Sequence, residues 1–422
     1  MTQPPPVHVL ANGVRVVCDS VPGMETLALS VVAGRGARFE DPRRNGWSHL
    51  LEHMVFKGAG ERSARDIVEA VEAQGGQINA ATGYERTSFQ VRALADGLPL
   101  GMQVLADLVQ RPTLDAAEME REKHVVGQEI AEAADTPDDQ VFEIAQAAAF
   151  EDQPLGRPIL GATETLRDAK PEALEAWRAG LYAPDSLVIS AAGAVDPAQL
   201  LDLAEAGFGA ARGPAPMVME AARFTGGRAV ERRRLEQAHL VFMLPAPSVL
   251  DPDYWPLRLF AEALGGGMSS RLFQEVRERL GLAYAIDAYT DGWADAGVLG
   301  IYAGCGAADA ATLAAEVAAQ IRALATQAHG GELDRAKAQL KAGLLMGRES
   351  LLTRAEQAAA QLLVFGRIVP SAEFVTAIDA VDGNDLARIG ARLIASQRAS
   401  VAALGPKAAG AAAAAFEESL FG

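Results

Sequence analysis

The alternation of apolar and polar residues along the chain predicts strands and helices in the same order twice. In the first half, strand-like runs lie at 27–34, 78–94 and 186–193, and segments with a helical period lie at 46–57, 64–74 and 98–110. In the second half, strand-like runs lie at 238–247, 283–304 and 399–405, and helical segments lie at 253–264, 269–279 and 309–325. Corresponding segments are about 210 residues apart, which indicates a duplicated domain.

The order of these elements predicts an α+β fold with two homologous domains. The runs at 78–94 and 283–304 each contain a turn and fold back as hairpins, so each domain is expected to be a mostly antiparallel sheet covered by helices. Glycine, proline and other small residues gather at 213–228, which is typical of an interdomain linker. The expected domains are therefore 1–212 and 229–422.

Composition narrows the class of protein. The 422 residues carry a formal net charge of -17, which speaks against nucleic-acid binding because phosphates need a basic surface. This charge either attracts cationic ligands or serves solvation alone. Two cysteines cannot build a disulfide framework, and the start of the chain lacks the basic and apolar regions of a signal peptide. No apolar run is long enough to cross a membrane, so we expect a cytoplasmic protein.

The stretch HLLEHMVFKG at 49–58 carries the strongest chemical signal. In a helix, His49 and His53 lie one turn apart on the same face and can bind one zinc ion. Glu52 lies beside them and can act as a general base. The alternative is a pair of histidines without a metal, and the acid between them makes that alternative the weaker one.

The pattern H-x-x-E-H is the inverted form of the zinc-peptidase motif H-E-x-x-H. Together with GGQINAATGYERTSF, EREKHVVGQEIAEAADTPDD and SSRLFQEVRERLGLAYAIDAY, it makes the chain resemble the family of insulin-degrading enzyme, pitrilysin and mitochondrial processing peptidase. The chain is most similar to the short-subunit branch, which includes the processing-peptidase β subunit and bacterial peptidases. The resemblance spans nearly the whole chain and implies two domains that form half of a clamshell around a chamber.

The resemblance also implies roles for acidic residues. Glu129 follows His53 by 76 residues, at the family's position for a third zinc ligand, and Glu122 corresponds to an acid that supports the site. One Zn²⁺ per chain is therefore expected. Without the resemblance, either glutamate would be an ordinary solvated helix acid.

Further residues are implied to act on the substrate. Asn79 and the backbone of Ala80 would hold an extended peptide as an added strand at a sheet edge. Arg277 and Tyr284 match a family pair that acts on the substrate and the developing oxyanion. Each of these residues also has a purely structural interpretation, in a strand-turn, a solvated helix or the edge of a core.

Two acids beyond the ligand helix bear on specificity. Asp139 and Glu143 match positions that contact a basic residue near the cut in the processing-peptidase β subunit, so basic peptides are expected substrates. A helix start enriched in acids for dipole reasons is an equally good interpretation.

The expected function is that of a zinc-dependent metalloendopeptidase acting on peptides or unfolded segments. A non-catalytic assembly or core subunit of a larger complex is the alternative, and a metal-storage module is disfavoured because Glu52 would be idle. The longer relatives place the zinc motif and the Arg/Tyr pair in their first and last domains, so we expect a homodimer, or a heterodimer with a paralogous chain, that brings the two sets together.

Overall fold

The computed structural model describes residues 4–327 and 330–422, which divide into two compact units. The first unit comprises 1–131, 158–220 and 345–370, and the second comprises 132–157, 221–344 and 371–422. Each unit contains one large sheet with helices on it, in agreement with the α+β fold expected from the sequence. Within the part of the chain that the structure describes, no helix has the length and apolarity needed to span a membrane.

The sheet of the first unit has six strands in the order β1-β2-β8-β3-β7-β6. Its strands are β1 (Val7–Val9), β2 (Arg15–Ser20), β3 (Thr26–Ala33), β6 (Gln77–Thr82), β7 (Thr87–Leu94) and β8 (Leu187–Gly193). A small ladder joins β4 (Gly58–Ala59) to β5 (Arg62–Ser63). Strands β2 and β8 run parallel, and the other neighbours are antiparallel. Strand β6 therefore forms one edge of this sheet.

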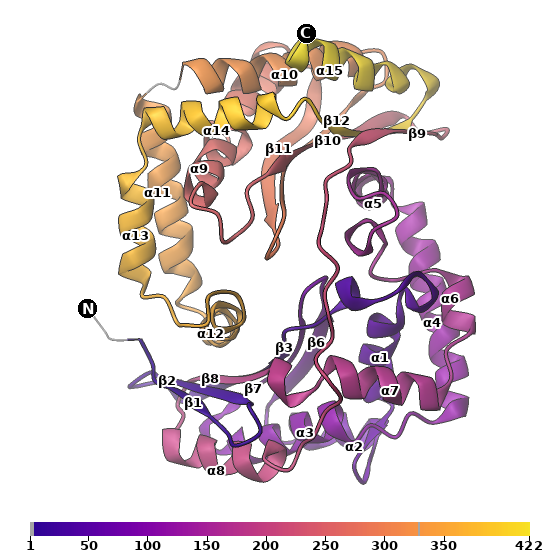
Figure 1. The fold of residues 1–422 in the computed structure, drawn as a ribbon, viewed down its shortest axis with the longest axis vertical. Coiled ribbons are helices and arrows are strands. Elements are labelled where there is room, and N and C mark those ends of the chain that lie inside the picture. The colour runs from indigo at the N-terminus through magenta and orange to yellow at the C-terminus, as the bar shows by residue number, and fades with distance from the viewer. Residues whose placement is uncertain (1–3, 328–329) are drawn as a thin grey trace. The chain divides into compact units, whose positions relative to one another are not determined.

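Helices cover both faces of the first sheet (Figure 1). The helices of this unit are α1 (Trp47–Val55), α2 (Ala64–Glu72), α3 (Leu98–Gln110), α4 (Ala116–Asp135), α6 (Thr163–Arg167), α7 (Pro171–Leu181), α8 (Pro197–Phe208) and α12 (Leu351–Phe365). Short 3-10 turns lie at Ala37–Phe39, Pro42–Arg44, Ala95–Gly97 and Pro184–Ser186. On β3, Leu29 and Val31 pack into the core with α3, whereas Val32 packs against α12. This two-sided burial explains why β3 is an almost unbroken apolar run.

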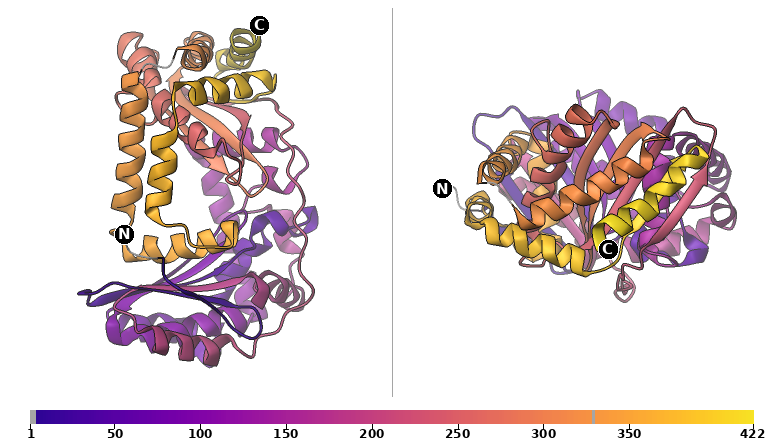
Figure 2. Two further views of the ribbon diagram at one scale, coloured as in Figure 1. Left: turned by 60° about the vertical axis from the view of Figure 1, so that its left-hand side comes forward. Right: turned by 90° about the horizontal axis from the view of Figure 1, so that it is seen from above.

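Helix α12 comes from the second half of the sequence and packs on the first sheet. Figure 2 shows it along the face opposite α3 and α8. The Arg354 guanidinium donates two hydrogen bonds of 2.9 Å to the Asp19 carboxylate on β2, and the Arg15 side chain donates to the Leu362 carbonyl. These contacts fix the helix on the sheet.

The sheet of the second unit has the order β11-β12-β10-β13-β9. Its strands are β9 (Gly227–Arg232), β10 (Gln237–Ala246), β11 (Ala283–Gly292), β12 (Gly297–Gly306) and β13 (Ser400–Gly405). Strands β9 and β13 are parallel, and the remaining neighbours are antiparallel. Read from β9 to β11, this order matches β2, β8, β3, β7 and β6 of the first sheet strand for strand. The strand order therefore confirms the internal repeat that the sequence predicts.

Helices also cover the second sheet. The helices of this unit are α5 (Pro137–Ala149), α9 (Tyr254–Gly265), α10 (Ala310–Thr326), α11 (Gly330–Gly347), α13 (Ser371–Ala380), α14 (Gly383–Ala395) and α15 (Ala412–Phe421). Short helical turns lie at Pro154–Gly156 and Lys407–Ala411, and a π-helix spans Phe273–Arg279. Apolar side chains of α9, α10 and α14 share one core with β10 and β12. Helix α5 contacts β10, β13 and β9, where the Ser400 hydroxyl donates to the Ala145 carbonyl.

The two units exchange helices, and this changes the domain boundaries. The expected domain 1–212 contains α5, and the expected domain 229–422 contains α12. In the structure α5 packs on the sheet of the second unit, and α12 packs on the sheet of the first. The expected linker at 213–228 is free of helix and strand up to Gly226, and the division between the units falls between Glu220 and Ala221.

Candidate metal centre

Helix α1 presents the H-x-x-E-H motif and begins at a fixed point. Gly46 precedes it with a φ of 91°, a conformation that favours glycine. The Glu40 carboxylate accepts hydrogen bonds from the backbone N–H groups of Gly46 at 2.9 Å and Ser48 at 2.7 Å. Burial raises the pKa of Glu40 to about 6, and these donors oppose the rise. The apolar side chains Leu50 and Met54 point into the core, so the polar face of α1 is left for the motif.

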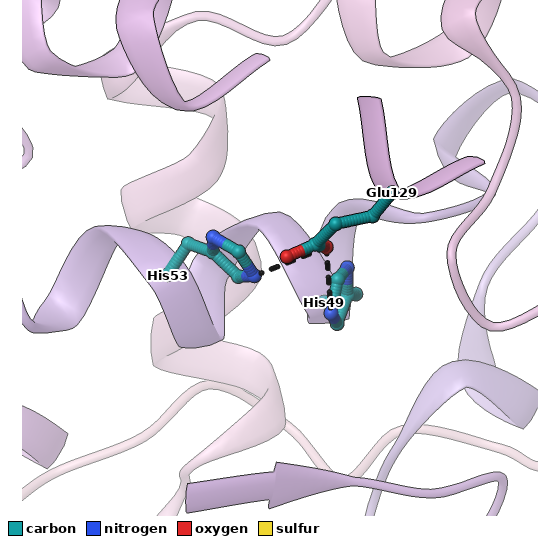
Figure 3. A group of neighbouring side chains, drawn as sticks. All are labelled: His49, His53 and Glu129. Carbon is teal, nitrogen blue, oxygen red and sulfur yellow. Dashed lines mark ion pairs between the residues drawn. The ribbon is translucent and has the colours of Figure 1, made fainter. Parts of the chain in front are cut away.

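His49 and His53 meet Glu129 of helix α4. The Glu129 carboxylate Oε2 lies 3.5 Å from His53 Nε2 and 3.8 Å from His49 Nε2 (Figure 3). One donor atom from each of the three residues can be chosen so that all lie within 4.8 Å of one another. Tetrahedral zinc bonds of about 2 Å place donor atoms about 3.3 Å apart, so the three side chains fit one zinc ion after small adjustments.

The His49 imidazole is in the protonation state that a metal requires. Burial, and to a smaller extent the neighbouring His53, lowers the pKa of His49 to about 4. His49 is therefore a neutral ligand at physiological pH. Its Nδ1 atom is buried and makes no hydrogen bond among the described residues. The ring centroids of the two histidines are 4.7 Å apart, as expected for residues one turn apart on a helix.

Glu122 lies against the Nδ1 atom of the His53 ring. It lies seven residues before Glu129 on α4 and is buried, with 4 % of its surface exposed. Its Oε2 lies 3.0 Å from His53 Nδ1, and its Oε1 lies 2.8 Å from Lys57 Nζ. If His53 Nδ1–H donates to this carboxylate, the lone pair of Nε2 faces Glu129.

Backbone pairing sets the distance between α1 and α4. The Thr113 N–H, near the start of α4, donates to the Gly58 carbonyl at 2.8 Å, just after the end of α1. The Gly60 N–H donates to the Arg111 carbonyl at 2.8 Å in the same way. Asp115 then accepts from two N–H groups in the first turn of α4. These hydrogen bonds fix the position of α4 along α1, so that the acids of α4 lie next to the histidines of α1.

A residue of strand β6 holds Glu52 beside His53 and Glu129. The Thr82 hydroxyl, at the end of this strand, donates a hydrogen bond to Glu52 Oε2. Burial raises the pKa of Glu52, and the hydrogen bond from Thr82 opposes the rise. A carboxylate in this position can accept a proton and return it.

Asn79 and Ala80 lie on the same strand, β6, at the open edge of the first sheet. Beside this edge is a surface cavity of about 700 Å³, lined by Phe56, Val68, Glu72, Gly76, Gln77, Ile78, Asn79, Gln90, Arg92 and Leu352. The edge and the cavity belong to the unit that holds the two histidines and Glu129.

The other predicted site residues belong to the second unit. Asp139 and Glu143 are on α5, where burial and then Asp139 raise the pKa of Glu143. Arg277 is in the π-helix Phe273–Arg279, with its guanidinium 4.7 Å from the centroid of the Phe273 ring. Tyr284 is on β11 and is 65 % exposed. Their action at the metal site stays a prediction.

Two residues at this site, Lys57 and Thr82, were not predicted from the sequence. Neither of them was given a role there. Both stand inside the quoted motifs, so the motifs contained the signal. Their partners, Glu122 and Glu52, become visible only in the tertiary structure.

Comparisons with known proteins agree with this geometry. The family model described as insulinase (peptidase family M16) matches residues 15–163, and the peptidase M16 inactive domain matches residues 168–340. An uncharacterized zinc protease from Rickettsia bellii is 33 % identical over 95 % of this chain and 97 % of its own length. An uncharacterized zinc protease from Bacillus subtilis is 35 % identical over 89 % of this chain and 92 % of its own.

The fold has a counterpart among solved structures. A protease from Helicobacter pylori superposes with a TM-score of 0.88 at 19 % identity, covering 96 % of this chain and all of the other. At that identity the likeness bears on the fold alone. On the sequence matches and the family models, the chain belongs to the insulinase family of zinc peptidases, peptidase family M16.

Proposed function

We propose that the chain is a zinc-dependent endopeptidase that hydrolyses peptides and unfolded polypeptide segments. The observation that carries this proposal is the convergence of His49, His53 and Glu129, with Glu52 beside them. A zinc ion held by these ligands would supply Lewis-acid polarisation of the scissile carbonyl and make a water molecule more acidic. The names of the relatives, which are zinc proteases, support the same reaction.

The protein residues would share the remaining work. Glu52 would take a proton from the attacking water and return it to the leaving amine. The edge of β6 at Asn79 and Ala80 would pair with the backbone of an extended peptide, which grips substrates with little regard to sequence. The cavity next to this edge would receive a substrate side chain.

We further propose a preference for substrates with Arg or Lys near the scissile bond. The chain has a net charge of -17, and Asp139 and Glu143 are close enough in space for Asp139 to raise the pKa of Glu143. A basic side chain placed there would relieve the repulsion between the two acids. Cleavage of a mixed peptide library at low and high salt tests this: a flat, salt-insensitive profile contradicts it.

A two-fold dimer would complete the site. In this proposal Arg277 and Tyr284 of one subunit act on the substrate at the metal centre of the other. A phenol and a guanidinium can both stabilise a developing oxyanion.

Removal and restoration of the metal tests the proposed function. Purified protein treated with a chelator should lose hydrolysis of an internally quenched peptide, and one equivalent of zinc should restore it. An assembly subunit without activity, the alternative, predicts no hydrolysis in either state. Hydrolysis that survives complete removal of the metal contradicts the proposal.

A further inference from the structure

Lys57 is paired with Glu122, a buried acid beside His53. Its ammonium nitrogen lies 2.8 Å from Glu122 Oε1, while Glu122 Oε2 lies 3.0 Å from His53 Nδ1. The Glu122 side chain is 6 % exposed and that of Lys57 is 32 % exposed. Both carboxylate oxygens are therefore engaged, one by the lysine and the other by a proposed metal ligand.

The charge balance at Glu122 depends on Lys57. A carboxylate withdrawn from water needs a compensating cation or several hydrogen bonds, and an unpaired buried charge is costly. His53 has to be neutral to bind a metal, so it can donate a hydrogen bond but cannot supply a positive charge. Among the residues that the structure describes, Lys57 is then the cation paired with Glu122.

The backbone after α1 places the Lys57 side chain within reach of Glu122. The Phe56 N–H donates to the His53 carbonyl at 3.2 Å, and the Lys57 N–H donates to the Met54 carbonyl at 3.1 Å, so the helix closes with one tight turn. Gly58 follows with a φ of 148°. A Cβ at Gly58 would lie 2.7 Å from the Thr113 hydroxyl oxygen, so the chain can turn away there only as glycine.

We propose that Lys57 is a positioning residue for the metal centre. It holds the Glu122 carboxylate in the orientation that accepts the Nδ1–H of His53, and His53 in turn presents Nε2 to the metal. This inference rests on the proposed zinc site and adds a residue that contacts Glu122, which in turn contacts His53. Lys57 itself does not contact the metal or the substrate.

The experiment measures the zinc dissociation constant of the full chain by competition with a chromogenic chelator. Lys57→Met keeps the apolar stem and removes the charge, and Lys57→Arg keeps the charge. Lys57→Met should weaken zinc binding by about 10-fold, at the lower end of effects seen for groups that orient ligands. Lys57→Arg should recover most of the loss.

A matched control comes from a lysine elsewhere in the chain. Lys341 pairs with Asp379 at 2.6 Å, and its side chain is 31 % exposed, close to the value for Lys57. Lys341→Met should leave the zinc dissociation constant within about twofold of wild type. An equal effect of both substitutions would overturn the proposal, because general loss of a surface charge would then explain the result.

A double-mutant cycle tests whether Lys57 acts through Glu122. In a Glu122→Gln background the carboxylate is absent, so adding Lys57→Met should cost less than about twofold further. The absorption spectrum of the cobalt-substituted protein at saturation should also change in Lys57→Met, because the ligand geometry changes. Additive losses with an unchanged cobalt spectrum would show that Lys57 serves only the fold.

The wild-type measurement separates the two proposals. If wild-type protein binds no zinc, the proposed function fails, and the role of Lys57 fails with it. If wild type binds zinc and Lys57→Met binds it equally well, the role of Lys57 is overturned and the proposed function stands.

Discussion

Thr82→Val removes the hydroxyl that holds Glu52 and changes little else. Valine has nearly the same shape as threonine and is also branched at Cβ, so β6 should keep its conformation. The Thr82 hydroxyl donates to Glu52 Oε2 and fixes how the carboxylate faces the metal ligands. Without it the carboxylate can rotate away from the productive orientation.

The size of the effect follows from the strength of this contact. A hydrogen bond to a charged group contributes about 1.5–3 kcal/mol, which corresponds to about 10- to 150-fold in rate. The bond is already present in the free enzyme, so its strength sets only an upper limit, and the loss of activity comes from the misoriented carboxylate. We therefore expect kcat/KM of Thr82→Val to fall by about 10-fold, the lower end of that range. Thr82→Ser keeps the hydroxyl and should stay close to wild type.

The pH profile gives an independent sign. Thr82 holds the pKa of Glu52 down against the effect of burial, so its removal raises that pKa. Glu52 acts as a base only when ionised, and the acid limb of kcat/KM should therefore move to higher pH in Thr82→Val. The assay is hydrolysis of a quenched peptide from acid to neutral pH, with zinc content measured on the same samples. Full zinc with activity within about twofold of wild type would refute the reasoning, as would equal losses in Thr82→Val and Thr82→Ser.

Three further predictions concern the ligands, the assembly and the fold. Glu129→Ala should abolish stoichiometric zinc binding, whereas Glu122→Ala should weaken it by about 10- to 100-fold; metal analysis after dialysis checks this, and the reverse order would exchange the two roles. A mixture of Glu52→Gln and Tyr284→Phe chains should recover activity toward about half of wild type in mixed dimers, and subunit exchange without recovery would contradict shared sites. Burial raises the pKa of Glu40 from 4.5 to about 6, so the folded chain binds this proton more tightly than the unfolded chain does. The free energy of unfolding of wild type, relative to that of Glu40→Gln, should therefore fall by about 2 kcal/mol as the pH rises from 4.5 to about 6. Chemical denaturation at several pH values checks this, and parallel pH curves of the two proteins would contradict it.

Much of the fold could be predicted because period and repeat are local or self-similar properties. The helix expected at 46–57 is observed at Trp47–Val55, and the one expected at 98–110 is observed at Leu98–Gln110. The antiparallel hairpins lie where the turns at 78–94 and 283–304 predict them. A duplicated order of strands then fixed the class of fold.

The exchange of α5 and α12 could not be predicted. An apolar helical face shows that a helix packs on something, but it does not say which sheet it covers. Ala358 and Leu362 would fit the core of either unit by composition, and they lie on β2, β3 and β8 of the first. The segment Phe273–Arg279 is a π-helix, but the sequence predicted only a helix there. An α-helix with i→i+4 hydrogen bonds and a short π-helix with i→i+5 hydrogen bonds have similar patterns of apolar residues.

Part of the metal site could likewise be predicted from the sequence, and part could not. The spacing of His49 and His53 follows from one turn of helix, whereas the choice of Glu129 depended on the family resemblance because 76 residues separate it from His53. Lys57 and Thr82 were missed because their contacts depend on how α4 and β6 lie against α1.

The central claim is that Glu52 is the general base of a zinc peptidase, and Glu52→Gln tests it most directly. The amide has nearly the same shape as the carboxylate but cannot accept the proton. Turnover of a quenched peptide should be measured for wild type and Glu52→Gln, each with its zinc content determined. We predict that Glu52→Gln keeps the zinc of wild type and loses activity by about 100-fold or more. Wild-type turnover by a zinc-loaded Glu52→Gln chain would contradict the claim.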